Sequence, residues 1–177
     1  SYDGEGTSHL KIYSAVRNES GRNWVNVTEL PFNDKVYSSG HPALSVDNKT
    51  LYFVSDREGG LGQTDIYSVE IKSDSTYGNP VNLGDKINSP GREMFPFVAK
   101  DSTFYFSSDG HINLGLLDVF KSDIIKDKQA TPENLGAPFN SRFDDFAFFI
   151  NPENETGFLS SNRGDGSGSD DIYRFSS

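Results

Sequence analysis

The sequence lacks cysteine, and it has one methionine and one tryptophan among 177 residues. Without cysteine, the chain can form no disulfide framework, no thiolate-ligated metal site and no cysteine nucleophile. No apolar run approaches the ~20 residues that a transmembrane helix requires. Positive charge is scarce, because 16 Lys and Arg stand against 26 Asp and Glu, for a net charge of −10. This deficit argues against nucleic acid and anionic membranes as partners, since both need a basic surface.

Aromatic residues, by contrast, make up 13% of the chain, with 14 Phe and 8 Tyr. A chain so rich in aromatic side chains is expected to fold rather than to stay disordered. Its length suits one domain or part of one. The sequence starts with Ser rather than Met, and we expect the chain to be processed or to be cut from a longer protein.

An internal repeat with a constant offset of 53 residues runs through the sequence. In each copy an apolar segment ends in serine, a Gly-containing loop follows, and an Asp-aliphatic-aromatic triplet comes next. The serines are Ser55, Ser108 and Ser161, and the triplets begin at Asp65, Asp118 and Asp171. Lys11-Ile12-Tyr13 is a weaker upstream copy. The linkers repeat too, as Asn82-Leu83-Gly84 with Ile87-Asn88-Ser89, and as Asn134-Leu135-Gly136 with Phe139-Asn140-Ser141.

Each repeat predicts short β-strands separated by turns, and no segment carries a helical stripe. In one repeat the expected strands are 42–45, 51–55, 65–71 and 81–83. The alternation in residues 51–55 places Leu51, Phe53 and Ser55 on one face and the other two residues on the opposite face. Residues 47–50 are expected to turn, because Asp and Asn bind their own backbone and tolerate left-handed geometry.

Four short strands in every ~50 residues predict an all-β fold built of β-propeller blades, each a four-stranded antiparallel sheet. Two whole units, at about 41–93 and 94–146, lie between partial units at about 1–40 and 147–177. All of 1–177 is therefore assigned to one propeller domain, with about three and a third blades of a six- or seven-bladed ring. Because an open arc leaves strand edges unpaired, we expect the rest of a parent chain or a second copy to complete the ring.

The first unit carries the most distinctive pattern. It consists of His41-Pro42-Ala43-Leu44-Ser45, Asp47, Leu51-Tyr52-Phe53, Ser55-Asp56-Arg57, Gly59-Gly60, Gly62 and Asp65-Ile66-Tyr67. This pattern resembles the repeat of TolB-type, WD-like β-propellers. Its form, with a Gly-rich loop before Asp-Ile-Tyr, is similar to the propeller of OmpA-family cell-envelope proteins of Bacteroidetes. The second unit departs from it, with Gly110-His111 in place of Arg57-Glu58, and the third has a rearranged loop at 164–166.

The resemblance implies a periplasmic, outer-membrane-associated protein, because some of these envelope proteins belong to the type IX secretion and gliding apparatus. It covers the propeller only, so peptidoglycan binding by an OmpA-like domain is not implied for these residues. A propeller also hosts many unrelated activities, so function must be argued from its site.

The repeated aspartates Asp65, Asp118 and Asp171 leave two interpretations open. Their carboxylates could ligate calcium together with loop carbonyls. They could instead cap each loop by accepting backbone N–H groups, which we favour because a residue repeated in every blade usually builds the blade. We therefore expect no cofactor, with calcium as the alternative.

No Ser elbow, phosphate loop or metal-ligand spacing is present in the sequence, and adjacent carboxylates in a strand point to opposite faces. We therefore expect a noncatalytic interaction module that binds an envelope protein through Gly-rich loops at one end of the ring. The candidate contacts are residues that differ between blades: Arg57, Glu58, His111, Asn113, Arg163 and Asp165. For Arg57 and Arg163 the other interpretation is structural, with each guanidinium paired with the loop aspartates. Two alternatives remain, a glycan-binding module that uses calcium or aromatic platforms, and the accessory propeller of a hydrolase.

Overall fold

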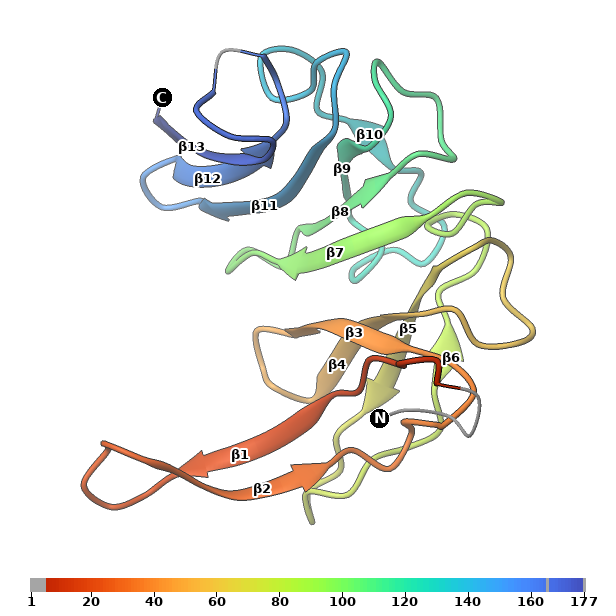
Figure 1. Ribbon diagram of the computed structural model, residues 1–177, viewed down its shortest axis with the longest axis vertical. Coiled ribbons are helices and arrows are strands. Elements are labelled where there is room, and N and C mark those ends of the chain that lie inside the picture. The colour runs from red at the N-terminus through yellow and green to blue at the C-terminus, as the bar shows by residue number, and fades with distance from the viewer. Residues whose placement is uncertain (1–5, 165, 177) are drawn as a thin grey trace.

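Antiparallel β-strands form the regular structure of the computed structural model, which describes residues 6–164 and 166–176 (Figure 1). A hairpin of β1 (Tyr13–Arg17) and β2 (Trp24–Glu29) comes first. Blade 1 contains β3 (Ser39–Leu44), β4 (Thr50–Ser55), β5 (Asp65–Glu70) and β6 (Val81–Asn82). Blade 2 contains β7 (Glu93–Val98), β8 (Phe104–Ser108), β9 (Asp118–Ser122) and β10 (Glu133–Asn134). Blade 3 contains β11 (Asp145–Asn151), β12 (Thr156–Ser161) and β13 (Asp171–Ser176).

Within each blade, neighbouring strands in the sequence are neighbours in the sheet. Figure 1 shows the blades side by side, with their first strands β3, β7 and β11 next to one another. The loops that follow β4 and β8 lie at one end of the blades, and the β3–β4 and β7–β8 turns lie at the other (Figure 1). The all-β prediction with four-stranded antiparallel blades is confirmed.

Three hydrophobic clusters fill the spaces between successive sheets. Phe53 and Leu51 of β4 pack toward the β1–β2 hairpin with Ile12. The opposite face of β4 packs against blade 2, with Tyr52 beside Phe104 at a ring distance of 5.0 Å. The two predicted faces of residues 51–55 are therefore both buried. Full burial of a Phe stabilises the fold by roughly 1.5–3 kcal/mol, so these clusters are the main attraction between blades.

A β-bulge interrupts the first strand of every blade. The residue in the bulge has a positive φ in each case, 47° at His41, 52° at Phe95 and 51° at Ala147. The bulge turns the side chains so that the His41 ring stacks on Phe95 at 4.1 Å, and Phe95 stacks on Phe146 at 5.2 Å. Burial lowers the pKa of His41. The sequence prediction missed the bulges and placed the first strand three residues late, at 42 rather than Ser39.

The turn between the first and second strands is also repeated. Asn48, Ser102 and Glu155 occupy its left-handed position, with φ of 57°, 68° and 51°. The residue before each of them is Asp or Asn, and in blade 1 the carboxylate of Asp47 accepts the N–H of Lys49 at 3.1 Å. The predicted turn at 47–50 is confirmed, including its left-handed geometry.

Blade 3 leaves one face open among the described residues. Tyr52 and Ile66 of blade 1 are covered by blade 2 and are 8% and 0% exposed. Their equivalents Phe158 and Ile172 in blade 3 are 47% and 76% exposed. The described residues thus form an open arc of blades. They contain no helix long and apolar enough to cross a membrane.

Candidate binding face at the repeated loops

The repeated aspartates close the loop between the second and third strands. The Asp65 carboxylate accepts the N–H groups of Leu61 and Gly62 and the side-chain amide of Asn82, the last at 2.8 Å. The equivalent donors to Asp118 in blade 2 are Leu114, Gly115 and Asn134. Because these donors engage both carboxylate oxygens, the two aspartates act as loop caps. The described residues hold no group of three or more His, Asp or Glu suited to a metal ion.

Two asparagines connect this cap to the strands. Asn88 is buried, and its Oδ1 accepts the Ile66 N–H at 2.8 Å while its Nδ2 donates to the Ile66 carbonyl at 2.9 Å. Nδ2 of Asn88 also donates to Oδ1 of Asn82, and Nδ2 of Asn82 donates to the Asp65 carboxylate. Asn140, Asn134 and Val119 repeat the arrangement in blade 2, and Asn33 pairs with both backbone groups of Ile12. In the sequence these asparagines stand out as part of the linker repeat, but the repeat alone does not indicate this role.

In blades 1 and 2 a glycine fastens the loop to the next blade. A Cβ at Gly62 would overlap the carbonyl oxygens of Ser89 and Gly91, which begin the approach to β7. This close approach lets the Gln63 N–H donate to the Gly91 carbonyl at 2.8 Å. In the same way, Gly115 lies against the carbonyls of Ser141 and Phe143 at the start of blade 3. The base of each of these two loops is therefore fixed between two blades.

Arg57 and Arg163 brace the loops from inside. Nε of Arg57 donates to Ser55 at 3.1 Å, and its Nη2 donates to the Phe32 carbonyl at 3.2 Å. The guanidinium also stacks over the Tyr67 ring at 4.9 Å. Burial lowers the pKa of Arg57, but a guanidinium stays protonated in proteins. Arg163 repeats these contacts with Ser161, Phe139 and Tyr173, and it forms an ion pair with Asp145.

In blade 2, different residues hold the loop in place of the arginine. His111 Nε2 contacts the Ile87 carbonyl at 2.8 Å, at the position equivalent to the contact of Arg57 with the Phe32 carbonyl. Gly110 stands at the arginine position, where a Cβ would overlap the Ser89 hydroxyl. Glu93 is fully buried and accepts three hydrogen bonds, two of them from Ser89. Burial raises the pKa of Glu93. In blade 3 the equivalent carboxylate, that of Asp145, forms an ion pair with Arg163.

The structure therefore places five of the six candidate residues. Arg57, Arg163 and His111 are half-buried and engaged inside the chain. Asn113 is half-buried, and its amide braces its own loop by donating to the carbonyls of Asp109 and Leu116. Glu58 is exposed at a loop tip. Asp165 lies outside the described residues.

Large apolar side chains at the loop tips were missed by the sequence reasoning. Ile112 is 96% exposed, and Leu61, Leu114 and Leu116 are each at least 50% exposed. They project from the loops after β4 and β8, beside the capped bases described above. The signal was in the sequence, because three aliphatic residues in 112–116 are unusual in a polar turn region. We call these four residues the apolar tips.

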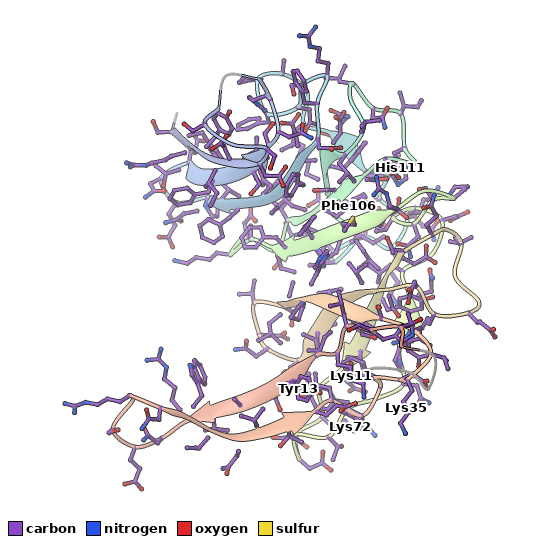
Figure 2. The ribbon with its side chains drawn as sticks, viewed as in Figure 1. Lys11, Tyr13, Lys35, Lys72, Phe106 and His111 are labelled. Carbon is purple, nitrogen blue, oxygen red and sulfur yellow. The ribbon has the colours of Figure 1, made fainter. Side chains whose placement is uncertain are left out.

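A pocket of about 470 Å³ is lined by Ile112, one of the apolar tips. His111, Phe120 and Pro132 also line it. Figure 2 shows His111 beside Phe106, and their ring centroids are 5.8 Å apart. Asp85 and Lys86 add one charge of each sign to the rim. The pocket can receive an apolar side chain flanked by polar groups.

No protein-family model and no curated protein sequence matches the chain. Solved structures do match its fold. TolB from Agrobacterium tumefaciens is 18% identical with a TM-score of 0.57, over 88% of this chain and 52% of that one. TolB from Acinetobacter baumannii is 17% identical with a TM-score of 0.55, over 93% and 35%. A thermostable family-43 glycoside hydrolase is 18% identical with a TM-score of 0.54, over 98% and 65%.

These comparisons establish the fold. The chain is a partial β-propeller, similar to the TolB-type propeller. It spans less than two thirds of the length of each of these three chains. Identities below one fifth carry no conclusion about activity or partner, because one fold hosts many functions.

Proposed function

We propose that this chain is a noncatalytic interaction module of a bacterial cell-envelope protein, which binds a protein partner through the loops at one end of its blades. The observation that carries the proposal is the contrast within each loop. The bases, held by Asp65 and Asp118, repeat from blade to blade, and Leu61 and Leu114 repeat with them. Ile112 and Leu116 do not, because the equivalent positions in blade 1 are Gly59 and Gln63. Ile112 is the clearest case, because a side chain 96% exposed gains stability only when another surface covers it.

The chemistry of the partner follows from charge and shape. The net charge of −10 favours a partner with a basic patch, which Glu58 and the other loop acids would steer into place. An apolar anchor of the partner would enter the pocket beside His111, since buried anchors supply most of the affinity at interfaces. Arg57, Arg163 and His111 act as positioning residues that hold the loops, and Asp165 remains a candidate contact.

The envelope setting of the proposal rests on the resemblance of the repeat to OmpA-family proteins of Bacteroidetes. A periplasmic, outer-membrane-associated location and a link to type IX secretion come from the same resemblance. In this proposal the rest of a parent chain or a second copy completes a six- or seven-bladed ring.

Site-specific photocrosslinking in the producing cells tests the proposal. A photoreactive residue is placed at Ile112 on a loop tip, and separately at Asp101 in the β7–β8 turn at the opposite end. We expect a discrete protein adduct from position 112 and none from position 101. A variant with Ile112→Asp and Leu116→Asp should lose the partner while it keeps its melting temperature. Equal adducts from both ends, or none from either, would contradict the proposal.

A glycan-binding module is the second candidate, favoured by an aromatic side chain exposed on a first strand. Phe149 is 47% exposed on β11, and its ring lies 5.0 Å from that of Phe97. Aromatic rings with a few polar groups are common in small-ligand sites. Titration with oligosaccharides, in calcium and in EDTA, decides between the candidates. Saturable binding that Phe149→Ala abolishes would favour this second function, or that of an accessory propeller of a hydrolase.

A further inference from the structure

The outer edge of β13 is an unpaired strand edge among the described residues. The third strands of blades 1 and 2 are covered by β6 and β10, whereas β13 pairs with β12 alone in residues 6–164 and 166–176. Ile172, the second residue of β13, is 76% exposed, whereas its equivalents Ile66 and Val119 are fully buried. An exposed edge with an apolar residue is a template for strand addition.

The equivalent edges show which residues such a strand needs. In blade 1, Asn88 binds both backbone groups of Ile66, and the Leu83 N–H donates to the same Ile66 carbonyl at 3.1 Å. Asn82 adds a bond to Asp65. Blade 2 uses Asn134, Leu135 and Asn140 for the same contacts around Val119. One sequence pattern, Asn-Leu-Gly-x-x-x-Asn-Ser, therefore occupies this edge twice in this chain.

The aliphatic or aromatic residue before the second asparagine adds an apolar contact. Ile87 is fully buried between blades 1 and 2, and Phe139 packs against Phe148 and Phe175 between blades 2 and 3. The corresponding surface of blade 3 is the open face with Phe158. A segment with the same pattern would thus cover apolar surface as well as satisfy the edge.

The binding groups of blade 3 are present and similar in geometry. The Asp171 carboxylate accepts the Gly168 N–H at 2.9 Å, as Asp65 accepts that of Gly62. Strand β13 keeps register with β12 through Ser160↔Ile172, just as β5 does with β4 through Val54↔Ile66. The outward backbone groups of Ile172 therefore point where an asparagine binds in blades 1 and 2.

We propose that the β13 edge is a strand-addition site for an extended segment of pattern x-Asn-Leu-Gly-x-x-(Ile/Phe)-Asn-Ser. The two asparagines determine its register, the first on Asp171 and the second on both backbone groups of Ile172. This proposal is independent of the loop-tip contact, because it uses the outer edge of blade 3 and not the loops after β4 and β8.

A synthetic peptide with the sequence of residues 80–89 tests the site in trans on the 177-residue chain. We expect saturable binding by calorimetry, and slower hydrogen exchange at the backbone amides of Ile172 and Arg174. A matched peptide with alanine at both asparagine positions should bind at least about tenfold more weakly, because each lost bond leaves a partner group unsatisfied.

Ile172→Pro is the control on the protein side. Proline removes the outward N–H of residue 172 but is tolerated on an edge, so the β12–β13 pairing should persist and peptide binding should be lost. Equal binding of both peptides, or binding that survives Ile172→Pro, would overturn the proposal. A further result would also overturn the proposal. If the native-sequence peptide does not bind, and the chain instead forms a dimer that Ile172→Pro dissociates, the occupant of the edge is a second copy.

Discussion

Removal of the loop cap in blade 2 should destabilise the protein far more than the same change in blade 3. Asp118→Ala leaves three donors without their acceptor: the backbone N–H groups of Leu114 and Gly115 and the amide of Asn134. Each unsatisfied buried donor costs about 1–3 kcal/mol, and water can reach part of this loop, so we expect a loss of about 3 kcal/mol. For a chain of this size that corresponds to a fall of about 6–12 °C in melting temperature.

Asp171→Ala is the matched comparison. Asp171 is half-buried, the Gly168 N–H that it accepts is exposed, and no asparagine of a fourth strand reaches it in the described residues. Its loss should cost under about 1 kcal/mol. Urea unfolding of both variants, followed by far-UV circular dichroism, gives the two free energies. Similar losses in Asp118→Ala and Asp171→Ala would refute the reasoning, because the fourth-strand network would then contribute nothing.

Three further predictions concern single sites. The folded pKa of Glu93 is raised above 4.5, so its contribution to stability is present below that pH and is lost as pH rises through the folded pKa. Glu93→Gln should remove this pH-dependent loss of stability, which is measured by comparing the free energy of unfolding of the two proteins across pH. Parallel curves for the variant and the unmodified protein would contradict the prediction. Glu155→Gly removes the steric strain of a side chain at a φ of 51° and should stabilise the protein by roughly 1 kcal/mol in urea unfolding. A destabilised variant would be the contrary result. Gly62→Ala should lower the melting temperature, because its Cβ overlaps the Ser89 carbonyl, whereas Gly168→Ala should not; equal effects would count against interblade docking.

The repeat made much of the blade predictable from the sequence. The strands β5, β9 and β13 begin at the repeated aspartates Asp65, Asp118 and Asp171. The favoured interpretation of these residues as loop caps agrees with the contacts of the first two, which have both oxygens engaged. The strands could be predicted from the alternation of side chains along the sequence, because each blade is built from local hairpins and the same two-residue alternation applies to every strand.

The roles of the variable loop residues could not be predicted in the same way. Arg57 and Arg163 differ from blade 2, and the sequence analysis therefore nominated them as contacts. Their acceptors include the backbone carbonyls of Phe32 and Phe139, in linkers more than twenty residues earlier in the chain. A carbonyl leaves no trace in the sequence, so only the fold could show that these guanidinium groups are engaged inside the chain.

The exchange in blade 2 explains why a variable position need not be a functional one. Without an arginine, Ser108 donates to Glu93 instead of accepting from a guanidinium, and His111 takes over the carbonyl contact from the following position. Two changes distant in sequence thus compensate each other within one blade. The side chains that remain exposed are those of the apolar tips, above all Ile112, which is 96% exposed. A residue that differs between blades but is compensated by another change within its blade therefore has a structural role. An exposed apolar side chain without such compensation indicates contact with a partner.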